Sequence, residues 1–445
     1  MSPSADEHKH EPKQGKLSWL QFTLFGVGCT MGTAFFLGSS IAIEKSGIYV
    51  LLTFLLVVII TYFIYAALAE LTAEHPEKGS FRTYAKKAFG RWAGFSTGWL
   101  YWASEMLILG ASLTALGLFS QFWFPSVPLW VYAGFYALLA LIVVIIGSRG
   151  INKAEDFFAI IKIAAVLMFI TIVVIALFRN PKQMDLSGQR MDEWLSPGWK
   201  GAWKGLLYAF YAFSGIEVMG FMAMNLRHPK EALKAGRVML LAVGLLYIVS
   251  IGLALVYISP KDVTPDKSPL TLALEVTGTP FFVHLLNGVF IIAGFSILVA
   301  SLYAVSTMLV TLSQDGDAPA KLADTVGKRK LPLYALGVNT LGLLVSIAMA
   351  LWMPKSIFEH IVTAGGLVLL YNWLIIAASY LKLGKPSVWG RLRTWIAIGF
   401  ILFAVSGTLM EPSSRPGFWA SLGILLIVAV ITLGMKHHWA AKESS

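Results

Sequence analysis

The sequence predicts an all-α polytopic membrane protein with twelve transmembrane helices, and three observations support this fold class. Of the 445 residues, 57% are hydrophobic and 13% are charged, with a mean hydropathy of +0.71. Soluble domains are roughly half apolar and a quarter charged, so a soluble enzyme is excluded. Twelve apolar stretches approach or exceed the length of about 20 residues that crosses a bilayer. The gaps between them are too short to hold a separate extramembrane domain.

The predicted helices follow one another closely along the chain. Their bounds are 19–43, 47–72, 92–119, 128–146, 157–178, 204–224, 238–258, 280–312, 333–353, 357–383, 394–409 and 418–435. The third and the eighth are longer than a helix needs to be to cross the bilayer, so we expect them to tilt or to extend beyond it. Trp19, Trp92, Trp130 and Trp203 lie near stretch ends, which is typical of interfacial anchors.

The distribution of Lys and Arg predicts the orientation. With the N-terminus in the cytoplasm, the cytoplasmic segments hold 24 of these residues and the outside loops hold 9. Because basic residues concentrate on the cytoplasmic side, we expect a multi-pass protein of the cell membrane with both termini in the cytoplasm. Residues 1–18 are then a polar tail without the features of a secretory signal. Residues 384–445 hold the last two helices and a short cytoplasmic C-terminus.

The residues that carry most metal and enzyme chemistry are sparse. The single cysteine, Cys29, excludes intramolecular disulfides and a cysteine-based metal cluster. The sequence contains no metal-ligand spacing and no nucleophile motif with a nearby base. We therefore expect no metal, no cofactor and no enzyme activity. The net charge of +11 lies largely in membrane-flanking loops, so we expect lipid and not nucleic acid as its partner.

The first predicted helix is interrupted. Gly28, Gly32 and Gly38 lie inside it together with Thr30 and Thr33, and each helical glycine costs about 1 kcal/mol relative to alanine. Gly28 and Gly32 could form a G-x-x-x-G packing face. We favour local unwinding, which is tolerated at membrane depth only beside a protein cavity. Amides exposed at such a break form an anion site.

The sixth predicted helix has a matching interruption at Ser214-Gly215, followed by Glu217. Helices one and six are five apart, which is the spacing of corresponding helices in two inverted five-helix repeats. Paired interrupted helices of this kind point to a transporter substrate site. The repeats then cover 19–178 and 204–383, with 179–203 as an extracellular loop between them.

Several motifs carry a family resemblance over about residues 20 to 330. They are GCTMGTAF at 28–35, AEL at 69–71, GSFRTYA at 79–85, WAGFSTGWLYW at 92–102, FSGIE at 213–217, HPKEA at 228–232 and DGDAP at 315–319. Together they resemble bacterial amino-acid permeases of the amino acid–polyamine–organocation superfamily. The resemblance implies the LeuT-type fold, with two inverted five-helix repeats and two additional helices.

The resemblance also implies how a zwitterionic substrate binds. Its carboxylate is held by amides and hydroxyls of Thr30, Gly32, Thr33 and Ala34. Its amine donates to carbonyls of Tyr211, Ala212 and Ser214, beside Gly215, with Phe213 or Tyr211 as an aromatic lid. Ordinary bundle packing is the alternative role for these two aromatic residues.

Lys162 lies inside the fifth predicted helix. A lysine at that depth costs about 2.5–3.5 kcal/mol, so we expect it to face the protein interior. In proton-coupled relatives a lysine on this helix occupies the place of a sodium ion and ties helix one to helix eight. The resemblance therefore implies proton coupling through Lys162, while snorkelling or simple bracing of the bundle is the alternative.

Three acids lie within or beside apolar stretches. Glu217 could relay a proton or orient the unwound backbone. Glu105 could pair with a substrate amine or a cationic side chain, or be satisfied by polar neighbours; Ser301 in the eighth helix is a further candidate. Glu70, near the end of the second helix, is expected to form a structural ion pair.

The chain departs from the family pattern at three positions. Ala34 replaces the second glycine of the family's G-x-G, so its methyl group could narrow the substrate range. Asn225 replaces an acidic residue before the HPKEA motif, and Thr307 replaces a frequent arginine. His284 and Asn287 in the eighth helix are weaker candidates, since a lone polar residue on an apolar helix is usually structural.

These observations predict a secondary active transporter of amino acids that works by alternating access with proton symport. An exchanger or facilitator of the same fold is the alternative, followed by a polyamine or amine transporter and by a channel. Neutral, aromatic and cationic substrates are all compatible with the candidate residues. The predicted partners are an amino acid, protons and the lipid bilayer, and no oligomeric state is predicted.

Overall fold

The structure is a computed structural model that describes residues 17–77, 79–147, 151–179, 188–326, 331–352 and 357–443. Most of the predicted tail, residues 1–16, lies outside the described residues. Within them the chain is helical, and pairing of extended backbone is limited to two isolated bridges. The predicted all-α membrane fold is confirmed.

The helices that form the bundle correspond to the twelve predicted stretches. They are α1 (Trp19–Thr30), α2 (Thr33–Phe36), α3 (Gly38–Ser46), α4 (Val50–Glu74), α6 (Arg91–Gln121), α7 (Leu129–Gly147), α8 (Ile151–Arg179), α10 (Gly198–Tyr211), α11 (Ile216–Met222), α12 (Ala232–Tyr257), α14 (Pro280–Gln314), α15 (Leu333–Trp352), α16 (Ile357–Leu383), α17 (Val388–Gly407) and α18 (Arg415–Glu443). The first and sixth stretches are each broken, as predicted.

Ten helical segments of the described chain are long and apolar enough to cross a membrane alone. The two remaining predicted stretches explain the difference from twelve. The first stretch begins with α1, which the break limits to 12 residues. The other is α15, whose apolar part is the shorter segment Leu333–Met349.

The connections contain helices that hydropathy did not predict. They are α5 (Ser80–Phe89), α9 (Gly188–Leu195) and α13 (Pro269–Val276), with 3₁₀ turns at Gly47–Tyr49, Ala223–Asn225, Pro229–Glu231, Pro260–Asp262, Ala320–Ala323 and Thr408–Met410. These helices are too short to cross a bilayer, and α5 mixes charged with apolar residues. The predicted loop 179–203 likewise contains α9 and the beginning of α10.

The eleventh helix begins earlier than its predicted start at residue 394. α17 starts at Val388 and includes Arg393, because the charge of Arg393 is paired with Glu70 of α4. Tyr380 also donates to Glu70. The structural ion pair expected for Glu70 is therefore confirmed.

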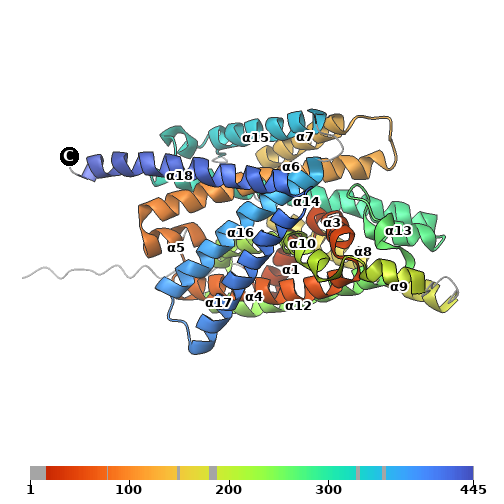
Figure 1. The fold of residues 1–445 in the computed structure, drawn as a ribbon. Helices are drawn as coiled ribbons and strands as arrows, with labels where there is room; N and C mark the ends of the chain where they lie inside the picture. The colour runs from red at the N-terminus through yellow and green to blue at the C-terminus, as the bar shows by residue number, and fades with distance from the viewer. Residues whose placement is uncertain are drawn as a thin grey trace, which may run out of the picture.

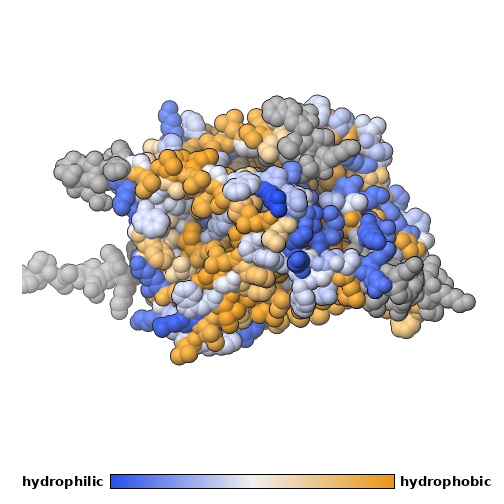
Figure 2. Space-filling model, viewed as in Figure 1, coloured by the Kyte–Doolittle hydropathy of each residue, from blue (hydrophilic) through white to orange (hydrophobic). Residues whose placement is uncertain are grey.

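Figure 1 shows the helices running as a bundle, with α5 and the end of α18 at one end and α9 and α13 at the other. We refer to these as the α5 end and the α9 end. Hydrophobic residues cover much of the visible side of the bundle, and the most hydrophilic ones gather mainly toward its ends (Figure 2). Leu241, Leu245, Ile427 and Val430 are among the exposed apolar residues of α12 and α18. Lipid therefore covers these faces in a membrane.

Ion pairs join the connections at the α5 end. The fully buried Arg82 of α5 donates to Asp315 at 2.7 Å and to Asp317 at 2.6 Å, just after α14, and Arg91 pairs with Asp317 at 2.9 Å. Partial burial alone would raise the pKa of Asp315. The hydrogen bond and charge of Arg82, together with Lys86, lower that pKa below its usual value. The DGDAP motif thus anchors α5 to the end of α14.

A second ion-pair cluster lies near the α9 end. Lys45 of α3 is 3.4 Å from Glu359 of α16, and Lys204 of α10 is 3.0 Å from Glu411. Partial burial alone would raise the pKa of Glu411, but its hydrogen bond to Lys204 and the charge of Lys45 lower it. The cluster ties both broken helices to the later helices at this end.

Candidate functional site

The first break separates α1 from α2. α1 ends at Thr30, Met31 and Gly32 are extended, and α2 begins at Thr33. A side chain at position 32 would collide with Ile297 of α14, so glycine permits the close approach of these two helices. The break leaves carbonyls of α1 and amides of α2 without intrahelical partners.

Two side chains satisfy carbonyls at the end of α1. The ammonium of Lys162, on α8, is 2.7 Å from the carbonyl oxygen of Gly28, and its side chain is fully buried. The hydroxyl of Tyr247, on α12, donates to the carbonyl of Thr30 at 3.2 Å. A cation is stabilised at this position because the C-terminal end of a helix carries partial negative charge. Lys162 therefore faces the interior and holds α8 against the break.

The second break separates α10 from α11. α10 ends at Tyr211, residues 212–215 form turns, and α11 begins at Ile216. Gly215 has φ +102°, a conformation that side chains disfavour. A Cβ at this position would also collide with the carbonyl oxygen of Cys29 in α1. The two breaks therefore touch through the backbone of Gly215 and Cys29.

Glu217 holds the start of α11. Its Oε1 accepts from the amide of Gly215 at 3.0 Å, and its Oε2 accepts from the indole N–H of Trp373, on α16, at 3.3 Å. The side chain is 1% exposed. An anion is favourable at the N-terminal end of a helix. Of the two roles considered for Glu217, orienting the unwound backbone is the one these contacts perform directly.

The other two half-helix ends carry no charged side chain of their own. α2 has no acidic residue in its first turn, and α10 has no basic residue in its last turn. Thr33 shares a hydrogen bond with Ser112 at 3.2 Å, whereas the buried hydroxyl of Thr30 has no partner. The carbonyl of Tyr211 accepts from the amide of Ser214 at 3.0 Å. Carbonyl oxygens have two lone pairs, so Tyr211 retains capacity to accept a ligand.

The aromatic residues at the second break are packed differently from each other. Phe213 is fully buried, and its ring centroid is 5.3 Å from that of Tyr247 and 6.1 Å from that of Phe54. The ring of Tyr211 instead lies against Gly38 and Gly366. Phe213 thus belongs to an aromatic cluster, and Tyr211 lies between α3 and α16.

Glu105 of α6 lies among several polar groups of the same region. Its carboxyl group is near the hydroxyls of Ser301 of α14 and Tyr101 and within electrostatic reach of Glu217, and the residue is 2% exposed. Glu105 Oε2 and the hydroxyl of Tyr101 are buried without a hydrogen-bond partner. The structure therefore brings both other candidates, Glu105 and Ser301, toward the second break.

Four residues that lie against the two breaks or Glu105 were not predicted from the sequence: Tyr101, Tyr247, Ile297 and Trp373. Trp373 carried a usable signal, because it lies near the middle of the stretch 357–383 and not near an end, where interfacial tryptophans lie. A tryptophan buried there needs an acceptor for its N–H. Ile297 carried no such signal, because it is an ordinary apolar residue in an apolar helix.

The weaker candidates have structural partners. His284 accepts from the indole of Trp123 at 2.9 Å, and Asn287 donates to the carbonyl of Phe119 at 2.9 Å. Thr307 donates to the carbonyl one turn earlier in α14. No group of three or more His, Cys, Asp and Glu side chains in the described part of the chain could hold a metal ion.

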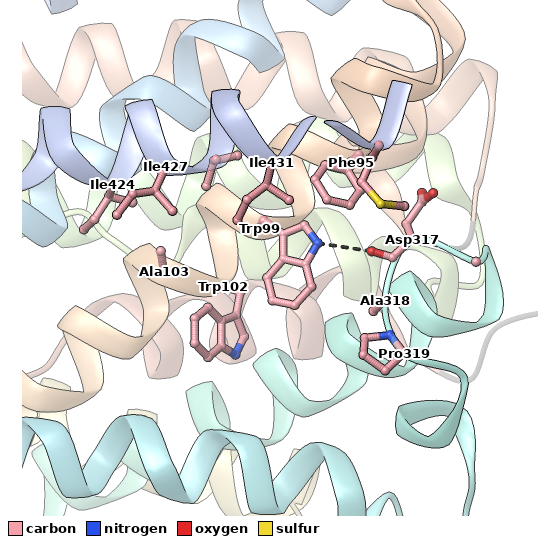
Figure 3. A pocket seen from close by; sticks show the side chains of 13 residues that line it. Phe95, Trp99, Trp102, Ala103, Asp317, Ala318, Pro319, Ile424, Ile427 and Ile431 are labelled. Carbon is pink, nitrogen blue, oxygen red and sulfur yellow. Dashed lines mark hydrogen bonds between the residues drawn. The ribbon is translucent and has the colours of Figure 1, made fainter. Parts of the chain in front are cut away.

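A separate groove of about 640 Å³ lies between α6, α18 and the segment after α14 (Figure 3). Trp99 and Trp102 form much of its floor, and Trp99 donates to the carbonyl of Asp317 at 3.2 Å. Apart from Asp317, the lining residues are not ionisable. The groove thus suits apolar groups.

The fold and this pair of touching breaks define a polytopic all-α membrane protein with two interrupted helices. Residues 21–443 match the model of the amino acid permease family, so the chain belongs to that family and is a transporter, not an enzyme. The resemblance described from the motifs is confirmed.

Individual relatives agree with this assignment. The chain is 50% identical to the uncharacterized transporter YcgH of Bacillus subtilis (strain 168), covering 96% of each chain. It is 28% identical to the aromatic amino acid transport protein AroP of Escherichia coli (strain K12), covering 98% of each. Its fold is similar to that of MhsT, solved in complex with L-phenylalanine, with a TM-score of 0.60 and 17% identity over 89% of this chain and 99% of that one.

Proposed function

We propose that this permease moves amino acids across the cell membrane by alternating access and proton symport, with both termini in the cytoplasm. The observation that carries this proposal is the distribution of charge at the two breaks. Lys162 neutralises the end of α1, and Glu217 neutralises the start of α11. The start of α2 and the end of α10 have no charged residue of their own.

A zwitterionic amino acid complements these two remaining ends. Helix N-termini favour anions and helix C-termini favour cations. The substrate carboxylate would therefore bind amides and hydroxyls of Thr30, Gly32, Thr33 and Ala34. The substrate ammonium would donate to carbonyls of Tyr211, Ala212 and Ser214, next to Gly215. Phe213 would border this site from its aromatic cluster.

Lys162 is the proposed proton-coupling residue. As an ammonium it holds the carbonyl of Gly28 and thereby fixes α1 against α8. A neutral amine attracts a carbonyl less strongly, because charge-assisted hydrogen bonds are roughly twice as strong as neutral ones. Gain and loss of a proton at Lys162 would thus alternately fix and release α1.

Uptake by purified protein in proteoliposomes tests this function. A radiolabelled amino-acid panel is offered with an inward proton gradient, which an uncoupler then collapses. Symport predicts accumulation that disappears with the gradient. Uptake that is unaffected by the uncoupler would contradict proton coupling, and no uptake of any amino acid would contradict amino-acid transport. Labelling of an engineered C-terminal tag from either side of intact cells tests the orientation.

An exchanger of the same fold is the second candidate. The hydrogen bond from Lys162 to Gly28 is consistent with exchange, because the carbonyl at the end of α1 needs a donor whether or not a proton is transported. Exchange predicts uptake only into liposomes that are preloaded with amino acid. Uptake into empty liposomes under a proton gradient favours symport.

A further inference from the structure

We propose that Glu105 determines substrate specificity and that the preferred substrates are amino acids whose side chain ends in a cationic group. This inference rests on the proposed function and specifies its substrate class. AroP is named for aromatic amino acids, so the inference separates this chain from that relative.

Glu105 lies in the region of the second break. Its carboxyl group, on α6, is near the hydroxyl of Ser301 of α14 and within electrostatic reach of Glu217 of α11. It also lies within electrostatic reach of the hydroxyl of Tyr211, at the end of α10. Three helices therefore converge on Glu105 beside the proposed ammonium site.

One oxygen of the buried Glu105 carboxyl group has no hydrogen-bond partner. The residue is 2% exposed, and its Oε2 has no hydrogen bond. The polar side chains nearest to this carboxyl group are the hydroxyls of Ser301 and of Tyr101, which is fully buried one turn earlier on α6. Buried charges are normally paired, since an unpaired one is strongly destabilising. Oε2 of Glu105 is thus an acceptor that a cationic ligand could use.

In the part of the chain that the structure describes, no cationic side chain forms an ion pair with either of these two acids. None of the ion pairs formed within the described ranges includes Glu105 or Glu217. Lys162 instead donates to the carbonyl of Gly28. Two carboxylates that share a dry site repel each other unless a proton or a cation intervenes. A cationic substrate group beside Glu105 would supply the missing positive charge.

Glu217 is less available, because each of its oxygens already accepts an N–H and these contacts hold the start of α11. Glu105 is therefore the acid that remains for the substrate. Ser301 and Tyr101 could accept further N–H bonds from an ammonium or guanidinium group. A polyamine has no carboxylate to place at the start of α2, so the site favours a cationic amino acid over a polyamine.

Competition for binding tests the inference without any substitution. Radiolabelled L-lysine is the probe for purified protein, and unlabelled L-lysine, L-norleucine, L-phenylalanine and putrescine are the competitors. Norleucine has the lysine side chain without its amine. Because breaking a buried charge pair costs about 2 kcal/mol or more, we expect lysine to compete about 30-fold more tightly than norleucine.

Glu105→Gln should remove this preference while keeping the side-chain shape. We expect the lysine-to-norleucine ratio to fall below about threefold, because the neutral amide gives no charge assistance. Glu74→Gln removes an exposed carboxylate at the end of α4 and should leave the ratio unchanged. Melting curves verify that each variant is folded.

The outcomes separate this inference from the proposed function. Tighter binding of norleucine or phenylalanine than of lysine by the native chain would overturn the role of Glu105, yet leave amino-acid transport intact. Putrescine that competes better than lysine would overturn the requirement for a carboxylate. If no amino acid binds or is transported, both proposals fail.

Discussion

The two helix breaks use opposite charges on opposite kinds of backbone group. At the first break a cation, Lys162, binds a carbonyl at the end of α1. At the second break an anion, Glu217, binds an amide at the start of α11. Each charge matches the partial charge of its helix end. Each break therefore commits one of its two ends to the fold and leaves the other without a charged partner.

The glycines at the two breaks also differ. Gly215 has a positive φ, and its Cα faces the backbone of Cys29. Gly32 has an extended conformation and faces the flexible end of the Ile297 side chain. Backbone cannot move aside as a side chain can. The second break should therefore tolerate substitution less than the first.

The largest effect is expected for Gly215→Ala. A residue with a Cβ costs about 1–2 kcal/mol in a left-handed conformation, and the methyl group would also overlap a backbone carbonyl. We expect little folded protein and no measurable uptake. Fluorescence-detected size exclusion and uptake measure both. The matched control is Gly134→Ala in α7, where space is open; a folded, active Gly215→Ala protein would refute the contact between the breaks.

Lys162→Ala should be the next largest change. The carbonyl of Gly28 loses its charged donor. The protonation state of residue 162 then no longer controls how tightly α1 is held against α8. We expect substrate binding to persist while accumulation driven by a proton gradient is lost. Binding and uptake are measured in parallel, with exposed Lys200→Ala as the control. Retained gradient-driven accumulation would show that Lys162 only braces the bundle.

Glu217→Gln should mainly reduce stability. Its amide nitrogen would face either the N–H of Gly215 or that of Trp373, and an unsatisfied buried donor costs about 1–3 kcal/mol. We expect a lower melting temperature. Adding Trp373→Phe removes one competing donor and should recover part of the loss. Equal melting temperatures for Glu217→Gln and the native chain would argue that Glu217 does not hold this break.

Gly32→Ala should have the smallest effect. Its methyl group meets the end of the Ile297 side chain, which can rotate, and overpacking of this kind typically costs about 1–3 kcal/mol. We expect weaker substrate binding that Ile297→Ala partly restores. Gly32→Leu should abolish binding. Normal affinity in Gly32→Leu would place the substrate away from the first break.

The two breaks could be predicted from the sequence because they contain residue types that apolar helices avoid. Gly32 and Gly215 interrupt otherwise continuous hydrophobic stretches, and Lys162 and Glu217 are charges that lipid does not tolerate. Helices α5, α9 and α13 could not be predicted in this way, because hydropathy detects only helices that are long and apolar. Trp373 was missed because tryptophans were interpreted as interfacial anchors.

Three properties are predictable from the sequence alone: the chain crosses the membrane repeatedly, two of its helices break at particular residues, and a lysine is buried in the bundle. These properties follow from local composition and from the cost of placing polar groups in hydrocarbon. The folded structure is needed to show that Lys162 meets Gly28, that Gly215 touches Cys29 and that Glu105 lies within electrostatic reach of Glu217. Such pairings join residues far apart in the chain, and packing of whole helices brings them together.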